Sequence, residues 1–353
     1  MSAVALSDEE QLAFFRGLVE RYSPSGDEDP AREYLLTELP ELGFHVETDE
    51  VGNVLATTGD PEADREIVLT SHMDTVPGEI DVRDEDGTLY GRGSVDAKGP
   101  LAAMCLAAAR ALVEDARVTV AAVVEEEVSG LGARHLVEER DAPAVLVNGE
   151  PSGWDTVTLG YRGILRFRYR VTGEVIHTAQ PGVNAIEDVM AFWHGVDDAV
   201  DGDDGFDSLH ATATKIDSDS DGFELQSELR GNVRIPPAHT VAEIRDLVQS
   251  VADDHRGQVF WGEHTEPVLV DRTNPVATSF RRAVRDAGGE PALSAKTGTS
   301  DMNVFAEHWD CPMVTYGPGD SNLDHTPDEH VSVDEFHRAV DVLERVVADL
   351  AEG

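Results

Sequence analysis

Short apolar runs, each followed at once by a polar cluster, recur along much of this chain of 353 residues. Four of them occupy residues 66–70, 118–124, 145–147 and 313–316. Continuous apolar runs of this length are typical of strands that are buried on both faces of a sheet. The pattern therefore predicts the central strands of an α/β fold.

Segments with apolar residues at helical spacing separate and flank these strands. They cover residues 7–22, 30–42, 101–112, 132–139, 279–287 and 333–351. Residues 44–57 alternate like a hairpin with Gly52 and Asn53 near its corner. Strands that alternate with helices in this way predict an α/β domain.

The middle of the chain follows another pattern. Residues 162–171 alternate with period two, which is typical of a strand with one wet face. Further helices and strands are predicted at 185–200, 223–234, 241–255 and 259–261, with acidic loops at 201–207 and 217–221. We therefore predict an α+β domain at 161–269, inserted into an α/β domain made from residues 1–160 and 270–353.

The charge of the chain restricts its partners. Its net charge is −43, with 70 acidic residues against 27 basic ones, which argues against binding nucleic acid or an anionic membrane surface. A surface with this much negative charge repels itself in dilute buffer, and molar salt screens the repulsion. We therefore expect a halophilic source, such as an archaeon. No run is apolar enough to span a membrane and no signal-peptide pattern opens the chain, so we expect a cytoplasmic protein.

Residues that can bind a metal ion stand where the predicted strands and loops end. They are His72, Asp96, Glu126 or Glu127, Glu150 and His325. Asp96, which closes the glycine-rich segment 91–96, could by itself simply cap the helix that follows. Ligands of open α/β sheets gather at the carboxyl ends of strands. Two histidines with several carboxylates and no thiolate suit a pair of zinc ions bridged by one carboxylate.

The same residues carry a resemblance to a known family. The segments 71–74, 91–96, 126–127 and 149–151, with the late His325, are similar to the motifs of the co-catalytic zinc exopeptidases and aminoacylases. That family includes carboxypeptidase G-like enzymes, succinyl-diaminopimelate desuccinylases and acetylornithine deacetylases. The resemblance covers nearly the whole chain. It implies a mixed-sheet catalytic domain and a lid or dimerisation domain at 161–269, so we expect a homodimer.

The resemblance implies a ligand set for two divalent ions. His72 and Glu150 would bind one ion, Glu127 and His325 the other, and Asp96 would bridge them. Zinc is the expected metal, and cobalt or manganese could occupy the same ligands. Paired cations lower the pKa of a water that they share, so that hydroxide forms at neutral pH.

Three residues would assist the reaction. Asp74 would hold the ring of His72 through its second nitrogen, and Glu126 would take a proton from water and deliver it to the leaving amine. His177 would donate to the tetrahedral oxyanion, within the chain or across a dimer, unless it is an ordinary surface histidine. The three glutamates at 125–127 leave the register open by one position, and the segment 128–132 favours Glu126 as base and Glu127 as ligand.

Three further segments narrow the resemblance. Residues 159–163, 296–303 and 316–327 are similar to a group of hydrolases of lysine and arginine biosynthesis. In that group the α-amino nitrogen of lysine or ornithine is linked to the γ-carboxyl of the C-terminal glutamate of an acidic amino-group carrier protein, and hydrolysis frees the amino acid. The resemblance thus implies this carrier as the substrate.

Candidate substrate-binding residues are Arg234, Lys296 and Thr299. Arg234 could bind a carboxylate in bidentate fashion or be a surface arginine at the end of a strand. Lys296 could bind a carboxylate or pair with Asp301. Because carrier and chain are both acidic, their encounter is opposed at low salt unless arginines at positions 162, 166, 168 and 234 supply local positive charge.

Two alternatives remain open from the sequence. The first is a deacetylase, desuccinylase or dipeptidase that acts on a free small substrate. The second is a metal-binding dimer without catalytic activity, which the presence of Glu126 beside five candidate ligands disfavours.

Overall fold

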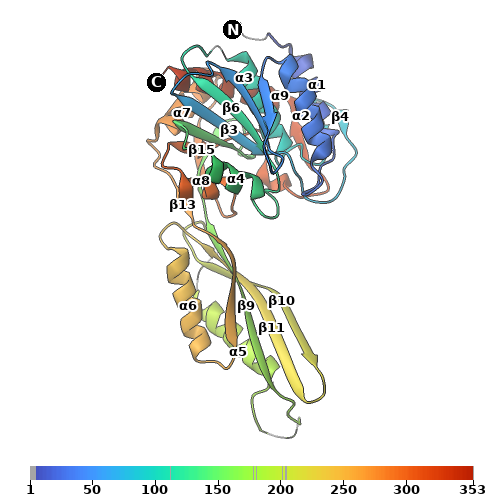
Figure 1. Ribbon diagram of the computed structural model, residues 1–353, viewed down its shortest axis with the longest axis vertical. Coiled ribbons are helices and arrows are strands. Elements are labelled where there is room, and N and C mark those ends of the chain that lie inside the picture. The colour runs from blue at the N-terminus through green and yellow to red at the C-terminus, as the bar shows by residue number, and fades with distance from the viewer. Residues whose placement is uncertain are drawn as a thin grey trace. The chain divides into compact units, whose positions relative to one another are not determined.

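The computed structural model describes residues 5–111, 113–177, 179, 181–200, 202 and 205–352. It divides into two compact units, shown in Figure 1. The α/β unit consists of Met1–Gly160, Val270–Ser294 and Val304–Gly353, and the insert unit of Tyr161–Leu269 and Ala295–Asn303. The insert unit therefore includes nine residues, 295–303, that the sequence pattern placed in the α/β domain. Backbone contacts hold them there, because the Arg162 N–H donates to the carbonyl of Lys296 at 3.2 Å.

A mixed sheet forms the centre of the α/β unit, with the strand order β1-β2-β6-β3-β7-β15-β8. Its strands are β1 (His45–Thr48), β2 (Val54–Gly59), β3 (Glu66–His72), β6 (Arg117–Val123), β7 (Val145–Gly149), β8 (Thr156–Tyr161) and β15 (Met313–Thr315), and β14 (Ala292–Lys296) pairs with β8. The strands β6, β3, β7 and β15 run parallel. All seven residues of β3 are buried, as expected for a strand between two layers.

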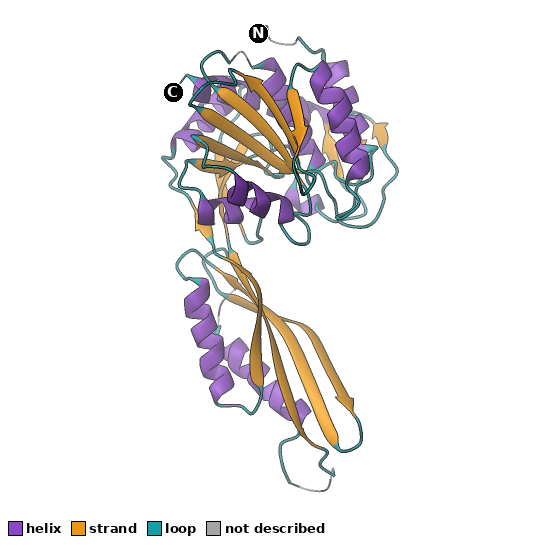
Figure 2. Cartoon of the chain, viewed as in Figure 1, coloured by secondary structure: helices purple, strands orange, loops and turns teal. Residues whose placement is uncertain are grey.

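Helices cover this sheet (Figure 2). They are α1 (Asp8–Val19), α2 (Asp29–Glu41), α3 (Lys98–Arg110), α4 (Leu131–Glu139), α7 (Pro275–Asp286), α8 (Asp301–His308) and α9 (Val333–Ala351), with a short 3-10 turn η1 at Ser321–Leu323. The alanine-rich α3 is buried along nearly its whole length and packs on α9, α1 and β3. It matches the helix predicted over 101–112, whose last residue, Leu112, lies outside the described residues. The patterns did not predict α8.

A small second sheet joins β16 (His330–Ser332), β5 (Thr88–Tyr90) and β4 (Arg83–Glu85) in that order. The sequence did not predict it, because strands of three residues are too short to show a period. It places the segment that follows His325 beside the segment that precedes the glycine-rich loop, since His330 pairs with Tyr90.

The insert unit holds a four-stranded antiparallel sheet in the order β10-β11-β9-β12. Its strands are β9 (Gly163–Glu174), β10 (His210–Ser220), β11 (Glu224–Ile235) and β12 (Gln258–Thr265). The two-residue β13 (Val268–Leu269), next in the chain, belongs to the mixed sheet, where it follows β8 in the strand order. The helices α5 (Ala185–Ala199) and α6 (Val241–Asp253) pack on one face of this sheet. Alternate side chains of β9, such as Phe167 and Tyr169, are buried beneath them.

The predicted acidic loop at 217–221 was wrong over most of its length, because β10 continues to Ser220. There Asp217 and Ser218 stand opposite Glu228 and Ser227 of β11, and the hydroxyls of the two serines lie 2.9 Å apart. In the acidic loop predicted at 201–207, three aspartates (201, 203 and 204) lie outside the described residues. Among the helices that the structure describes, none combines the length and the apolar character that crossing a bilayer requires.

Candidate metal centre

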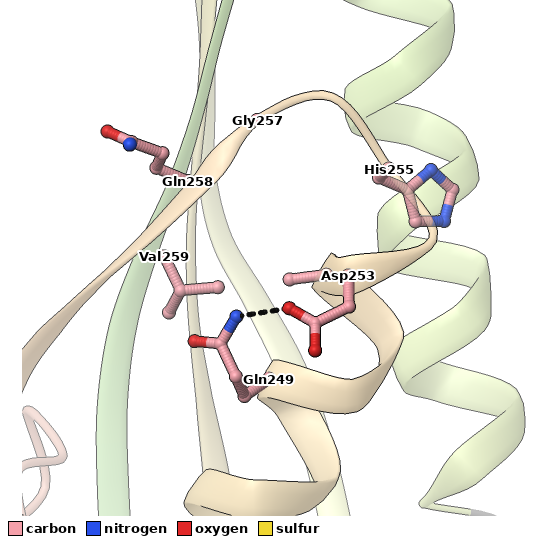
Figure 3. A pocket seen from close by; sticks show the side chains of 7 residues that line it. Gln249, Asp253, His255, Gly257, Gln258 and Val259 are labelled. Atoms are coloured by element: carbon pink, nitrogen blue, oxygen red, sulfur yellow. Dashed lines mark hydrogen bonds between the residues drawn. The ribbon is translucent and has the colours of Figure 1, made fainter.

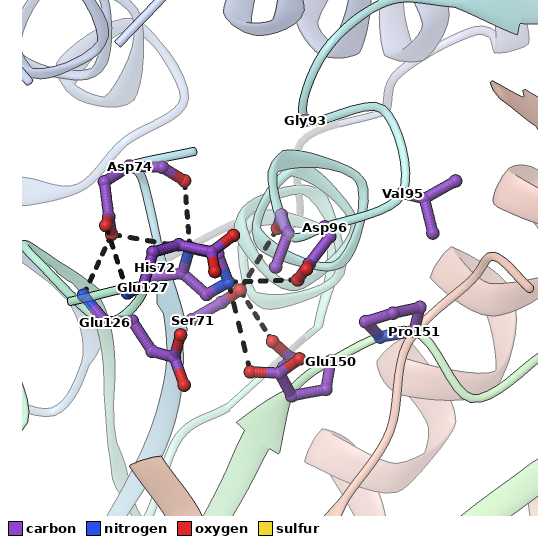
Figure 4. A network of polar contacts seen from close by, with 12 residues as sticks. Ser71, His72, Asp74, Gly93, Val95, Asp96, Glu126, Glu127, Glu150 and Pro151 are labelled. Carbon is purple, nitrogen blue, oxygen red and sulfur yellow. Dashed lines mark hydrogen bonds and ion pairs between the residues drawn. The ribbon is translucent and has the colours of Figure 1, made fainter. Parts of the chain in front are cut away.

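Three parallel strands end at one edge of the central sheet and bring His72, Glu127 and Glu150 to the same region (Figure 4). His72, the last residue of β3, stands level with Val123 of β6, and Ser71 stands level with Gly149 of β7. The glutamates at 125–127 and Glu150 therefore emerge beside His72. The Ser71 hydroxyl donates to the Gly149 carbonyl at 2.8 Å. A side chain on Gly149 would come within 2.6 Å of the Ser71 Cβ, so only glycine fits there.

Asp96 occupies the centre of the cluster. Its Oδ1 lies 3.2 Å from Nε2 of His72, and its Oδ2 lies 3.1 Å from Nε2 of His325. The His325 nitrogen also lies 3.1 Å from Oε1 of Glu127, and Oε1 of Glu150 lies 4.0 Å from Nε2 of His72. Pair contacts thus link the five predicted ligands, and a single carboxylate, that of Asp96, faces both histidines.

Asp74 braces the cluster from behind. Nδ1 of His72 lies 2.9 Å from the Asp74 backbone oxygen and 3.4 Å from its carboxylate, so the backbone is the nearer acceptor. The buried carboxylate accepts from the Ser25 hydroxyl at 2.7 Å and from the backbone N–H groups of Glu126 and Glu127 at 3.1 and 3.3 Å. Asp74 therefore fixes the glutamate loop as well as the imidazole.

The three glutamates have different surroundings. Glu125 has a left-handed backbone, with φ of 55°, and its side chain accepts from the Ser129 hydroxyl at 2.7 Å. It is engaged in its own turn. Glu127 contacts His325, and Glu126 lies next to it, partly exposed (Figure 4).

The electrostatics of the cluster favour a cation at its centre. Burial opposes the charged form of His72, but its hydrogen bonds to Asp74 and Asp96 outweigh burial and raise its pKa well above the usual range. Hydrogen bonds to Asp96 and Glu127 raise the pKa of His325 to about 10. Burial likewise opposes ionisation of Asp96, yet the two histidines lower its pKa. The carboxylates around the two imidazoles therefore favour positive charge at this point of the site.

The donor atoms fit a divalent metal ion. One ligand atom each from His72, Asp96 and Glu127 lie within 4.8 Å of one another. Imidazole and carboxylate without thiolate suit zinc, cobalt or manganese.

Glu329 is a residue of this centre that sequence reasoning missed. Its side chain is fully buried, and its Oε1 accepts the backbone N–H groups of Gly93, Val95 and Asp96 at 2.9, 2.9 and 3.1 Å. Its Oε2 accepts from Arg92 at 2.7 Å. Glu329 therefore holds the loop that presents Asp96. The available signal was the glycine-rich loop itself, whose amides need an acceptor.

Lys98 supports the same loop from inside. It is fully buried and its Nζ donates to the Arg21 carbonyl at 2.6 Å. Burial lowers its pKa to about 7, although Glu329 and Asp74 oppose that shift. Its stem packs against Gly93, where an added Cβ would come within 2.9 Å of the Lys98 Cδ and where φ is +86°.

Comparison with known proteins assigns the chain to a family. A model of peptidase family M20/M25/M40 matches residues 68–349. The chain belongs to this family. As an M20 peptidase it is a hydrolase that acts on amide bonds.

Its relatives align over nearly its full length. A putative [LysW]-lysine/[LysW]-ornithine hydrolase of Thermococcus kodakarensis is 38% identical over 98% of this chain and 93% of its own. The [LysW]-lysine hydrolase of Deinococcus radiodurans is 37% identical over 94% of both chains. A dinuclear metal-binding M20 peptidase of Bacillus subtilis has the same fold, with a TM-score of 0.77, 15% identity and 98% coverage of each chain. The predicted α/β fold with a mixed sheet is thereby confirmed.

The remaining predicted residues of this M20 chain lie in the insert unit. His177 is exposed in the loop after β9, where its Nδ1 accepts from the backbone N–H of Ala179 at 3.2 Å; its neighbours Thr178 and Gln180 lie outside the described residues. Arg234 is half-buried, and its guanidinium donates to the Thr299 hydroxyl at 3.5 Å. Burial lowers the pKa of Arg234, with Arg162 and Arg166 adding to the effect.

Lys296 is the last residue of β14 and is partly exposed. Its carbonyl, as noted for the insert unit, accepts from Arg162. Lys296 and Thr299 therefore share the insert unit with Arg234, whereas the histidine and carboxylate cluster belongs to the α/β unit.

A hollow in the insert unit lies between the end of α6 and the start of β12 (Figure 3). Its polar side chains serve local structure. The Gln249 amide donates to Asp253 at 2.8 Å, and the ring of His255 packs edge-on to Phe192 with centroids 6.0 Å apart. This hollow offers no cluster comparable to the one around Asp96.

Proposed function

We propose that the chain releases lysine, ornithine or both from an amino-group carrier protein, by hydrolysing the amide bond to the γ-carboxyl of the carrier's C-terminal glutamate. The reaction would serve lysine and arginine biosynthesis. The observation that carries the proposal is the convergence of two histidines and their carboxylates on one sheet edge, in a chain whose full-length relatives bear the name of such hydrolases.

Two divalent ions, zinc in the first instance, would be held by five side chains. His72 and Glu150 would hold one ion, Glu127 and His325 the other, and Asp96 would face both. When bound, such ions polarise the scissile carbonyl and lower the pKa of an attacking water.

The protein's own groups would move the proton and orient the ligands. Glu126 would accept the proton of the attacking water and pass it to the leaving amine. Asp74 would keep Glu126 and Glu127 in place through their backbone N–H groups and the His72 ring through its own backbone oxygen.

We propose further roles for residues of the insert unit. His177 would donate to the oxyanion, and Arg234, with Lys296 and Thr299, would bind a carboxylate of the substrate. We further propose that the protein is a homodimer, as the resemblance implies, and that it works in the cytoplasm. Its charge of −43 calls for molar salt, so we also propose a halophilic source.

Mass spectrometry of the carrier tests the proposal. The carrier, loaded with lysine or with ornithine, is incubated with the enzyme and zinc in molar salt. We expect its mass to fall by one lysine or ornithine residue, and the free amino acid to appear in equal amount. Unloaded carrier is the control and should keep its mass.

Two results would contradict the proposal. Hydrolysis of N-acetylornithine without any change in the loaded carrier would assign the enzyme to free small substrates. Zinc-independent release, unaffected by a chelator, would remove the metal ions from the reaction.

A further inference from the structure

One face of the insert sheet collects basic side chains in a chain that has few of them. Arg166, Arg168 and Arg170 occupy alternate positions of β9, so they share the face opposite to the one that α5 and α6 cover. Strand register adds Arg230 of β11, which stands opposite Arg168, and Lys215 of β10, which stands opposite Arg230.

We call this zone the arginine face; it consists of Arg166, Arg168, Arg170, Lys215, Arg230 and Phe260. Its cationic side chains are exposed, from 38% for Arg170 to 58% for Arg166. Phe260 of β12 is also exposed, and the guanidinium carbons of Arg168 and Arg170 both lie 5.5 Å from its ring centroid. Cation–π contacts of this kind hold guanidinium groups in place without neutralising them.

The negative charge on the face falls short of the positive charge. Among the described residues, three carboxylates pair with the five cations, namely Glu228, Asp217 and Glu263. Glu228 alone serves Arg168, Arg170 and Arg230. Farther along the sheet the same face turns acidic, with Glu174, Asp219 and Glu224, so the surplus is confined to the arginine face.

This arrangement is unfavourable for the sheet itself. Like charges directly opposite each other on neighbouring strands destabilise a sheet, and two such pairs occur here: Arg168 with Arg230, and Arg230 with Lys215. The surplus also acts on its surroundings, because Arg166 contributes to the lowered pKa of Arg234. A positive zone that weakens the sheet, within a chain of net charge −43, points to a role outside folding.

We propose that the arginine face docks an acidic protein surface and that this protein is the carrier bearing the substrate. The choice of the carrier rests on the proposed function, whereas the need for an acidic partner rests on the face. Guanidinium groups bind carboxylates in bidentate fashion, and a local positive zone steers an acidic partner that the rest of the surface repels. The resemblance implies that this carrier is acidic, so its surface would complement the arginine face.

Kinetics with two substrates test this inference. One substrate is the lysine-loaded carrier, and the other is a short peptide that ends in the same glutamyl-lysine amide. For Arg166→Glu/Arg168→Glu we expect kcat/KM on the carrier to fall by about tenfold or more at the lowest salt that keeps the enzyme folded. The same double variant should cleave the short peptide at the wild-type rate, and the deficit on the carrier should shrink as salt rises.

The matched control is Arg16→Glu/Arg282→Glu, which changes the net charge by the same amount. Both arginines are exposed and paired with one carboxylate each, in the α/β unit. This variant should stay within about twofold of wild type on both substrates, since isolated exposed ion pairs contribute little. The neutral pair Arg166→Gln/Arg168→Gln, with thermal unfolding of each variant, keeps the test valid if the reversed charges unfold the sheet.

Each other result overturns the inference in its own way. An equal loss on carrier and peptide would place the arginines in catalysis or folding, and an equal loss in both double variants would reduce the effect to net charge. Dissociation of an oligomer by Arg166→Glu/Arg168→Glu, seen by sedimentation, would make the face a contact between copies. Binding of a labelled oligonucleotide that the variant loses would assign the face to nucleic acid. If the wild type cleaves neither substrate, the proposed function itself fails.

Discussion

The cluster around Asp96 and the arginine face differ in how far their charged side chains are buried and paired. In the cluster, Asp96 and Glu329 are buried, 8% and 0% exposed, and each oxygen has a partner. On the arginine face, Arg166 is 58% exposed and Glu228 is shared among three arginines. The first arrangement fixes geometry, and the second provides charge that can adapt to a partner.

The difference has a physical origin. A metal ion demands ligand atoms within a few tenths of an ångström, so its ligands need neighbours that hold them. A protein partner brings carboxylates of its own and can be met by long side chains in several rotamers. We therefore expect substitutions in the cluster to have large and specific effects, and substitutions on the face to have small effects that depend on salt.

The largest effect is expected for Glu126→Gln. Removing the proton acceptor should lower kcat by about 100- to 10,000-fold, while the metal content per chain stays at the wild-type level by elemental analysis. The matched control is Glu125→Gln, because the Glu125 side chain is bonded to Ser129 in its own turn. Its kcat should change far less. A large loss of kcat in Glu125→Gln and a small loss in Glu126→Gln would assign the role of base to Glu125 and that of metal ligand to Glu126.

A smaller but specific effect is expected for Glu329→Gln. The amide nitrogen would face either Arg92 or the loop N–H groups, all of which are donors, so the loop that carries Asp96 should loosen. We expect metal affinity to fall about 10- to 100-fold, measured by competition with a chelator. Because the loop recovers its ligand geometry once metal is bound, kcat at saturating zinc should stay near wild type.

Glu66→Gln is the control for that experiment. Glu66 is also buried and pairs with Arg117 and Arg140, but it begins β3, whereas His72 ends it. Both variants should lose stability, on the order of 1.5–3 kcal/mol, and only Glu329→Gln should lose metal affinity. Equal affinities in the two variants would show that Glu329 supports the fold and not the position of Asp96.

The sequence alone revealed most of the cluster for a simple reason. His72 ends a strand, Asp96 ends the glycine-rich loop, and Glu127 and Glu150 follow strands. A parallel topology brings such strand ends to one edge. Local signals therefore sufficed for residues far apart in the chain. Glu329 escaped because its role depends on a small sheet whose three-residue strands have no readable pattern.

The insert was harder to predict in detail. Period-two alternation showed that Arg166 and Arg168 share a face of β9, but not that Arg230 and Lys215 join them. That fact needs the register of β9, β11 and β10, which the alternation within a single strand does not specify. The sequence patterns predicted no strand over His210–Ser220, because the side chains of β10 are exposed almost throughout and its acidic residues resembled a loop.

A buried carboxyl on the covered face of the insert sheet should make the free energy of unfolding depend on pH. Asp188 of α5 is 4% exposed; burial opposes its ionisation, but hydrogen bonds from Tyr169 and Arg256 outweigh burial and lower its pKa. A carboxyl whose folded pKa is depressed stabilises the fold above its unfolded pKa of about 3.9, and that contribution is lost as pH falls through the folded value.

We therefore expect Asp188→Asn to lower the free energy of unfolding by about 1.5–3 kcal/mol at neutral pH. The gap between wild type and variant should narrow below about pH 4, as measured by urea unfolding across the pH range. An equivalent gap at pH 7 and pH 3 would mean that packing, and not the charge of Asp188, makes the contribution. Carrier kinetics should not respond, since the residue lies on the other side of the sheet from Arg168.

The smallest expected effect is a gain in kcat/KM, where the earlier substitutions cause losses. Glu228→Gln removes the carboxylate that three arginines share, so the positive surplus of the arginine face grows by one. The arginines are exposed enough to hydrate, so stability should change by less than about 1 kcal/mol. If the face docks an acidic partner, kcat/KM on the loaded carrier should rise by roughly two- to threefold at low salt and return to the wild-type value at high salt.

A fall in kcat/KM would instead mean that Glu228 orients the arginines for docking, and in that case Glu228→Asp should restore the wild-type value. No salt-dependent change in either variant would separate the arginine face from the carrier altogether, while leaving the cluster around Asp96 untouched.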